Sequence, residues 1–170
     1  LDYNATTPLD PEVIAFMKPV MEEYFGNPSS LYSYGSKAKI LIEEARSNLA
    51  DLIGCKPHEV IFTSGGSESN NMAIKGIAFS SRQKGNHIIT SSIEHPAVME
   101  VCHYLESQGF RITYTPVSED GIIDLSKLES SIDNQTILIT VMHANNETGV
   151  IQPVEEIFGI AVKHHIPFHT

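Results

Sequence analysis

The sequence predicts an α/β fold with a mainly parallel sheet, and three observations support this fold class. From residue 60 onward, short apolar runs rich in β-branched residues alternate with stretches of helical periodicity, the order expected of parallel strands connected by helices. The runs are apolar throughout, as expected where helices cover both faces of a sheet. The length of 170 residues, with 41% hydrophobic and 19% charged residues, is that of a globular domain.

The first 60 residues predict a loop followed by two helices. Asp10 and Pro11 are a typical N-cap and first helical residue, and apolar residues recur behind them at helical spacing. Pro19 lies inside this pattern, so we expect it to kink or shorten the helix. A longer helix is expected over residues 36–53, with Gly54 as its C-cap.

The remaining residues predict five strands and four helices. The strands are expected at residues 60–63, 87–90, 111–117, 136–142 and 166–169. The helices are expected between them at residues 68–79, 96–105, 125–132 and 154–163. Ligands of an open α/β sheet bind at the carboxyl ends of its strands, so site residues are expected in the segments that follow the strands.

Charge and hydropathy exclude several classes of partner. The net charge of −10, from 21 acidic and 11 basic residues, argues against a broad nucleic-acid surface. The sequence holds no apolar run long enough to span a membrane and does not start like a signal peptide. The two cysteines, Cys55 and Cys102, are expected to be free thiols in a reducing compartment. These features predict a cytoplasmic protein that binds neither nucleic acid nor membrane.

The segment from Thr63 to Asn71 predicts a phosphate cradle. It follows a predicted strand and opens a helix, where Gly65 and Gly66 let a ligand approach the backbone closely. The unpaired N–H groups of the first helical turn favour an anion, and Ser67 adds a hydroxyl donor. The alternative is an ordinary helix that Ser67 and Ser69 merely cap. The segment has neither the lysine of a Walker loop nor the glycine spacing of a dinucleotide fingerprint.

Two further polar segments follow predicted strands. His95 comes after the strand at residues 87–90, where an imidazole can stack on a ring or transfer protons, or alternatively can be satisfied at a helix start. Asn145 and Asn146 follow the strand at residues 136–142, where two amides either bind a ligand or build a β-turn.

The other histidines and cysteines predict no site. His58 and His87 are expected in surface turns, and Cys102 is expected in the core. The spacing of histidine and cysteine matches no metal-binding motif, so no metal is expected.

Five motifs, in the same order as in a known family, cover nearly the whole chain. They are residues 1–8, residues 25–30, residues 62–71, the pair Glu94-His95, and residues 144–149 with Gln152-Pro153. In these motifs the sequence resembles the cysteine desulfurase and selenocysteine lyase family of pyridoxal-phosphate (PLP) enzymes, in the class V aminotransferase group.

The resemblance implies a fold, a cofactor and a set of site residues. The fold is the three-layer large domain of the fold type I PLP-dependent transferases, with an N-terminal arm at residues 1–15 and the N-terminal part of the large domain at residues 16–170. In that family Gly66 and Ser67 would hold the phosphate of PLP. His95 would be the catalytic histidine that stacks on the cofactor ring and carries protons. Asn146 would contact both cofactor and substrate, and Asn4 would lie beside the substrate.

The resemblance also implies an activity and partners. The intact enzyme would remove sulfur or selenium from L-cysteine or L-selenocysteine, giving L-alanine and an enzyme persulfide or selenide. It would be a homodimer that passes sulfur to an acceptor protein for iron–sulfur clusters or thiolation. A tyrosine at Tyr32, where the family often has histidine, is more typical of the selenocysteine lyase branch.

The motifs of the family's C-terminal half are missing from the sequence. They include the lysine that anchors the cofactor, the mobile catalytic cysteine, and the aspartate that pairs with the cofactor ring. We therefore expect the chain to be an inactive N-terminal part of the enzyme. Two alternatives stay open: a non-catalytic product that binds phosphate or a partner subunit, and another class V aminotransferase.

Overall fold

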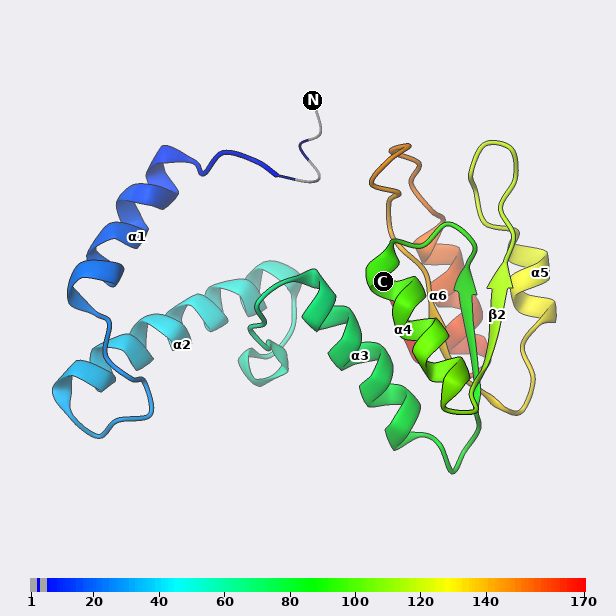
Figure 1. Cartoon of the computed structure of the whole chain (residues 1–170), viewed down its shortest axis with the longest axis horizontal. Helices are drawn as coiled ribbons and strands as arrows, with labels where there is room; N and C mark the ends of the chain where they lie inside the picture. Colours follow the sequence, from blue (N-terminus) through cyan, green and yellow to red (C-terminus); the bar gives the residue numbers. More distant parts are fainter. Residues whose placement is uncertain (1–2, 4–5) are drawn as a thin grey trace. The chain divides into compact units, whose positions relative to one another are not determined.

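The computed structural model describes Tyr3 and residues 6–170, so the expectation for Asn4 lies outside the described residues. These residues form two compact units that meet in the sequence between Phe62 and Thr63. The first unit contains α1, α2 and a short 3₁₀ helix, and the second contains the sheet and four helices (Figure 1).

The first unit begins with α1, which spans Pro11–Glu23. Its cap is the expected one, since the Asp10 carboxylate accepts a hydrogen bond from the Glu12 N–H at 2.8 Å. The helix extends four residues beyond Pro19, so the expected shortening does not occur. A proline removes only one N–H from the helical ladder, and the helix continues to its C-cap, where the Tyr24 N–H donates to the Val20 carbonyl at 3.2 Å.

The second helix, α2, spans Ser33–Ile53 and starts three residues before the predicted position. Gly54 ends it with φ of 72°, a left-handed conformation that favours glycine, and this confirms the predicted C-cap. The loop before α2 packs tightly against the start of the helix. A Cβ at Gly35 would collide with the backbone carbonyl of Asn27, so only glycine permits this approach.

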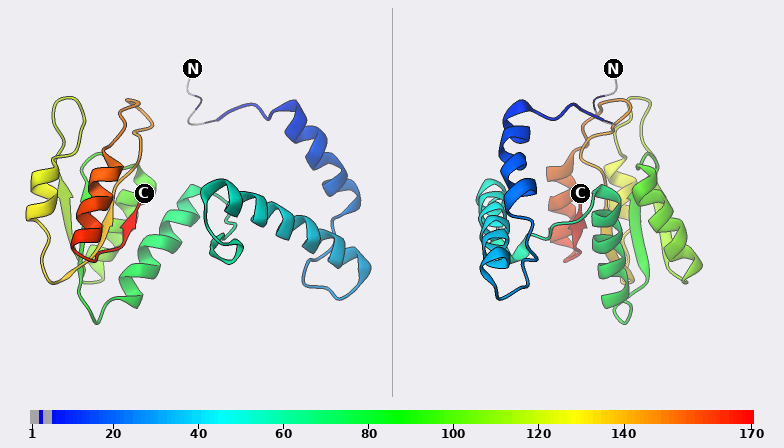
Figure 2. Two further views of the ribbon diagram at one scale, coloured as in Figure 1. Left: turned by 180° about the vertical axis from the view of Figure 1, so that it is seen from behind. Right: turned by 60° about the vertical axis from the view of Figure 1, so that its left-hand side comes forward.

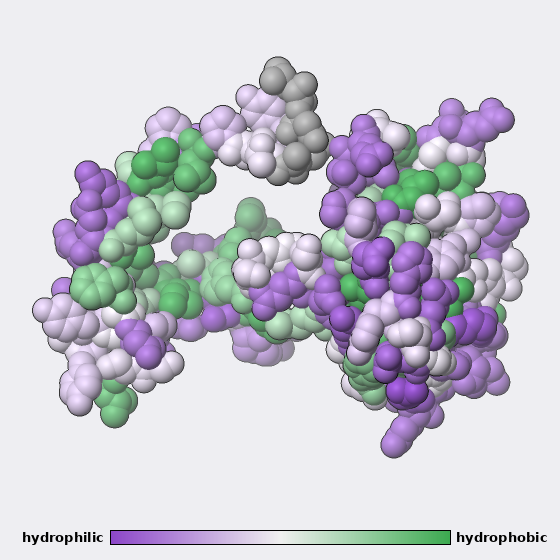
Figure 3. Space-filling model, in the orientation of Figure 1, coloured by the Kyte–Doolittle hydropathy of each residue, from purple (hydrophilic) through white to green (hydrophobic). Residues whose placement is uncertain are grey.

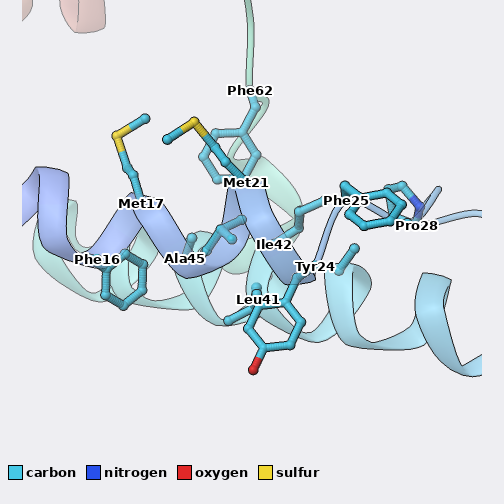
Figure 4. A pocket seen from close by; sticks show the side chains of 13 residues that line it. Phe16, Met17, Met21, Tyr24, Phe25, Pro28, Leu41, Ile42, Ala45 and Phe62 are labelled. Carbon is cyan, nitrogen blue, oxygen red and sulfur yellow. The ribbon is translucent and has the colours of Figure 1, made fainter.

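An apolar groove of about 540 Å³ runs between the elements of the first unit. Figure 4 shows residues that line it, among them Met17 and Met21 of α1, Leu41 and Ile42 of α2, and Phe62. No residue of α1 is buried. The groove is therefore an open apolar surface and not a closed core.

The expected strand at residues 60–63 is not formed. Residues 60–63 have irregular structure, and the side chains of Ile61 and Phe62 are 65% and 48% exposed. A strand requires a neighbour to pair with, and the described strands pair only with one another, in the order β2-β1-β3-β4. The Val60 carbonyl instead accepts a hydrogen bond from the Arg46 guanidinium of α2.

The second unit is a four-stranded parallel sheet with helices on both faces. Its strands are β1 (His87–Ser91), β2 (Arg111–Thr115), β3 (Thr136–Thr140) and β4 (Phe168–His169). Its helices are the predicted ones, with ends that differ by at most two residues: α3 (Gly66–Ser80), α4 (Pro96–Ser107), α5 (Leu125–Ser130) and α6 (Val154–Lys163). Four of the five expected strands are thus confirmed, although β2 and β3 each end two residues early.

Two buried clusters make this unit three layers thick. Ile88 and Leu138 point to one face of the sheet and pack against α3 and α4. The next residues along each strand, Ile89 and Ile139, point to the other face and pack against α5 and α6. Figures 1 and 2 show α4 and α6 on opposite faces of the sheet. The predicted fold class, an α/β three-layer arrangement with a parallel sheet, is confirmed.

The strand ends define where a site can form. Thr90 of β1 pairs with Tyr114 of β2 and Thr140 of β3, and Thr140 pairs with His169 of β4. Because the strands are parallel, the loops that follow them leave from one edge of the sheet. In the described part of the chain, no helix has both the length and the apolar character needed to cross a membrane.

Candidate functional site at the strand ends

His95 lies at the carboxyl end of β1 and caps α4. Its Nδ1 accepts a hydrogen bond from the Ala97 N–H at 3.0 Å, and Pro96 occupies the first helical position. The capping alternative is therefore realised, yet it uses only one ring nitrogen. An acceptor at Nδ1 leaves the proton of the neutral ring on Nε2. The side chain is exposed, so Nε2 and the ring face remain available to a ligand.

Glu94, the neighbour of His95, is buried with 8% exposure. One oxygen of its carboxylate, Oε1, accepts two hydrogen bonds, from the Ser91 hydroxyl at 2.7 Å and from the Met142 N–H at 2.8 Å. Burial raises the pKa of this carboxyl, and the two hydrogen bonds oppose the rise. The second bond joins the loop after β1 to the loop after β3.

The loop after β3 is built around Asn145. Its Oδ1 accepts hydrogen bonds from the N–H groups of Glu147 and Thr148 at 3.0 and 2.9 Å, as in an Asx turn. Its Nδ2 donates to the Ile93 carbonyl at 3.2 Å. Asn145 thus builds the turn that was one of the two alternatives, while the next residue, Asn146, is exposed.

Gln152 fixes the far end of this loop. It is buried with 2% exposure, and its Oε1 accepts from the Ile123 N–H at 2.9 Å while its Nε2 donates to the Gly121 carbonyl at 2.8 Å. Its own N–H donates to the His143 carbonyl at 2.8 Å. One buried amide therefore ties the loop after β2 to the loop after β3.

The start of α3 is open. No side chain caps it, so the alternative in which Ser67 and Ser69 cap the helix does not apply. A Cβ at Gly65 or Gly66 would meet no atom within 4 Å. The Glu68 carboxylate turns back to the Ser64 N–H and hydroxyl, both at 2.6 Å, and the Ser64 hydroxyl is the main cause of the lowered pKa of Glu68.

Two recesses meet at His95. One, of about 430 Å³, is lined by Ser67 and Asn71 of α3 together with His95 and residues of α4. The other, of about 190 Å³, is lined by Glu94, His95, Thr140 and His169. The structure therefore brings two of the sequence-predicted residues, Ser67 and His95, to one recess, with Gly66 next to Ser67.

His169 is a lining residue that the sequence analysis did not single out. Its Nδ1 lies 2.8 Å from the Thr140 hydroxyl, and burial lowers its pKa. Glu94 was likewise missed as an individual residue. Its signal was its position immediately before His95 in one of the matched motifs.

The remaining histidine and cysteine expectations have mixed outcomes. His87 is not in a surface turn, so that prediction is wrong: it is fully buried in β1, with ring nitrogens 2.8 Å from the Thr136 hydroxyl and 2.9 Å from the Thr113 hydroxyl. Cys102 is in the core as predicted, and burial raises its pKa to about 12. Both cysteines are free thiols. Among the described residues, no group of three or more His, Cys, Asp or Glu side chains could hold a metal.

Comparison with known proteins identifies the family. The aminotransferase class-V family model matches residues 1–170. The cysteine desulfurase IscS of Dictyoglomus turgidum (strain DSM 6724 / Z-1310) is 55% identical over 170 residues, which is all of this chain and 43% of that protein. The cysteine desulfurase of Mus musculus is 48% identical over 171 residues, covering all of this chain and 37% of that protein.

Solved structures agree with the sequence comparison. A structure described as SspA in complex with cysteine has a TM-score of 0.93 and 47% identity, with 99% of this chain and 49% of that chain covered. A NifS-like protein has a TM-score of 0.96 and 39% identity, with 99% and 47% covered. This chain spans less than half the length of these relatives. Enzymes of the matched family depend on PLP. The chain belongs to the aminotransferase class-V family.

Proposed function

We propose that this chain is the N-terminal part of the large domain of a PLP-dependent cysteine desulfurase, an enzyme that takes sulfur from L-cysteine and leaves L-alanine and an enzyme persulfide. The observation that carries the proposal is the recess shared by the open start of α3 and the ring of His95. The relatives named cysteine desulfurase, and the neighbour described as bound to cysteine, support cysteine as the substrate. L-Selenocysteine is the alternative substrate.

The residues at the start of α3 fit a phosphate group. The helix has no side-chain cap, and the space over Gly65 and Gly66 is open. The first N–H groups of a helix favour a dianion, both by hydrogen bonding and through the helix dipole. In this proposal Gly66 and Ser67 hold the phosphate of PLP, with the Ser67 hydroxyl as an added donor.

His95 is the proposed catalytic residue. Its Nδ1 is held by the Ala97 N–H, which fixes the ring and directs the Nε2 proton away from the helix. A ring fixed in this way can stack on the flat cofactor and hold or move a proton at Nε2. PLP itself supplies an electron sink for the charge that develops on the amino acid.

Asn146 and Asn4 are the proposed substrate residues. Asn146 stands beside the Asn145 turn, on a loop fixed by the bonds of Asn145 and Gln152. Its amide would donate to the substrate carboxylate or to the phenolic oxygen of the cofactor. Asn4 would lie on the substrate side of the same site.

The remaining groups of the reaction lie outside these residues in this proposal. Cys102 is unsuited to attack because it is buried and its thiol has a pKa of about 12, so it carries almost no thiolate at neutral pH. The attacking cysteine, the anchoring lysine and the aspartate that pairs with the cofactor ring would come from the rest of a longer polypeptide. That protein would be a cytoplasmic homodimer that passes persulfide sulfur to an acceptor protein, for iron–sulfur clusters or thiolation.

The protein isolated from its source tests the proposal. We expect an intact mass well above 18.7 kDa, a cofactor adduct that borohydride reduces to a stable covalent product, and release of alanine from cysteine. The variants Ser67→Ala and His95→Ala should weaken PLP binding by about tenfold, the usual effect of losing a hydrogen bond to a charged group or a stacked ring. Ser107→Ala, at the other end of α4, is the matched control.

A different outcome would favour another function. A mass near 18.7 kDa with no reducible adduct would contradict the proposal and support a non-catalytic protein that binds phosphate or a partner subunit. A reducible adduct without alanine release from cysteine or selenocysteine would support another class V aminotransferase.

A further inference from the structure

We infer that Glu94 is a positioning residue that sets the separation between His95 and the loop carrying Asn146, an inference that rests on the proposed function. The two loops that hold the proposed site residues are separate in sequence, and each follows a different strand. Pairing of β1 with β3 fixes where the two loops begin, so their placement beyond the strand ends depends on hydrogen bonds between them. Two of the described hydrogen bonds join these loops, and each uses the side chain of the residue directly before a site residue.

The first bond is the one from the Met142 N–H to Glu94 Oε1, at 2.8 Å. The carboxylate is itself anchored, because the Ser91 hydroxyl at the end of β1 donates to the same oxygen at 2.7 Å. Both Ser91 and Glu94 are buried, so water competes poorly for these bonds. Glu94 thus fixes Met142, in the loop after β3, to the end of β1.

In the second bond the side chain comes from the other loop. Asn145 Nδ2 donates to the Ile93 carbonyl at 3.2 Å, while Asn145 Oδ1 holds its own turn together. The residue before Asn146 therefore reaches the loop of His95, and the residue before His95 reaches the loop of Asn146. The two bonds form a reciprocal clamp between the loops.

The chemistry of the clamp requires an acceptor oxygen rather than a negative charge. Both donors meet the same atom, Oε1, so this oxygen accepts them whether or not the other oxygen carries a proton. A glutamine at position 94 offers the same acceptor in nearly the same place. An alanine removes it and leaves the Met142 N–H and the Ser91 hydroxyl without their partner.

The test uses the full-length protein with the variants Glu94→Ala, Glu94→Gln and Asn145→Ala, and with Glu119→Ala as a control at an exposed glutamate. In the cofactor-free protein, hydrogen exchange of the Met142 amide should be about tenfold faster in Glu94→Ala and unchanged in Glu94→Gln. In the loaded protein, Glu94→Ala and Asn145→Ala should weaken PLP affinity by about tenfold and shift the absorption maximum of the cofactor. Glu94→Gln and the control should match the wild type in both respects.

The outcomes separate the inference from the proposed function. Wild-type protein that binds no PLP would overturn the proposed function. Wild-type protein that binds PLP, with Glu94→Ala binding it equally tightly and with the same spectrum, would overturn the inference and leave Glu94 as a purely structural residue. An unchanged exchange rate of the Met142 amide in Glu94→Ala would overturn it as well.

Discussion

The two units of this chain use similar apolar residues in opposite ways. In the second unit, Leu138 and Ile139 of β3 are fully buried, one on each face of the sheet. In the first unit, Phe16 of α1 is 71% exposed and Leu52 of α2 is 80% exposed. Figure 3 shows apolar residues lying openly along α1 and α2. Apolar content alone therefore does not make a core: in the second unit, the sheet and the helices that cover both its faces bring these side chains together.

This difference in burial determines which unit contributes most to the stability of the chain. Burial contributes about 25 cal/mol per Å² of apolar surface removed from water, and α1 contains no buried residue. The second unit has two clusters, each formed by strands and helices from distant parts of the sequence. We expect the second unit to dominate the free energy of unfolding of residues 1–170, and three predictions probe this contrast.

The largest effect is expected from replacing a buried leucine of the second unit by alanine, compared with the same replacement at an exposed leucine of the first unit. Leu138→Ala removes a fully buried side chain and leaves a cavity, so it should lower the free energy of unfolding by about 2–5 kcal/mol. Leu52→Ala makes the same chemical change at an exposed position of the first unit and should change it by less than about 0.5 kcal/mol. Denaturant titration of both variants measures the contrast. Equal effects would show that the first unit buries more than the structure describes.

The next effect comes from His87, which joins three strands of the second unit. Its two ring nitrogens contact the Thr136 and Thr113 hydroxyls, and the charged groups near it are Arg111 and Asp133. Burial is the main cause of its lowered pKa, Arg111 adds to it, and Asp133 opposes it. A histidine with a lowered pKa stabilises the fold fully above its unfolded pKa, near 6.5, and this contribution is lost as the pH falls through the folded-state pKa.

We therefore expect the free energy of unfolding to fall as the pH is lowered from 7.5 to 5. His87→Gln should reduce this dependence, which amounts to about 1.4 kcal/mol for each unit by which the pKa is lowered. Part of the pH dependence should remain in His87→Gln, because burial also lowers the pKa of His169. His58→Gln, in the exposed 3₁₀ helix of the first unit, is the control substitution. An identical pH dependence in His87→Gln and wild type would contradict the prediction.

Local sequence patterns predicted most of the second unit because its elements have local causes. Asp124 and Pro96 mark helix starts, and the β-branched run of β3 marks a strand. The prediction failed at residues 60–63, whose composition suits a strand but which have no strand to pair with among the described residues. Composition shows that a segment can form a strand, whereas pairing depends on the rest of the fold.

The residues of the candidate site also fall into two groups, those that a local sequence pattern identifies and those that it does not. His95 and Ser67, which line one recess, could be found from the sequence because each follows a strand or opens a helix. Glu94 could not be recognised as a link to the loop after β3, because its partner Met142 is 48 residues away. His87 was placed wrongly for the same reason, since its two hydroxyl partners lie on two other strands. Hydrogen bonds that depend on the tertiary fold leave no local pattern.

The smallest effect is expected from removing a helix cap, and the chain offers two caps of the same kind for comparison. Asp10 caps α1 through the Glu12 N–H, and Asp124 caps α5 through the Lys127 N–H at 3.0 Å. Leu128 of α5 is fully buried in the second unit, so Asp124→Ala should lower the global free energy of unfolding by about 1 kcal/mol. Asp10→Ala should weaken α1 by a similar amount without a global change, because no residue of α1 is buried. Amide exchange along α1, compared with denaturant unfolding of both variants, separates the two responses. A global loss in Asp10→Ala would mean that α1 unfolds together with the sheet, and the contrast between the units would then be one of surface composition and not of stability.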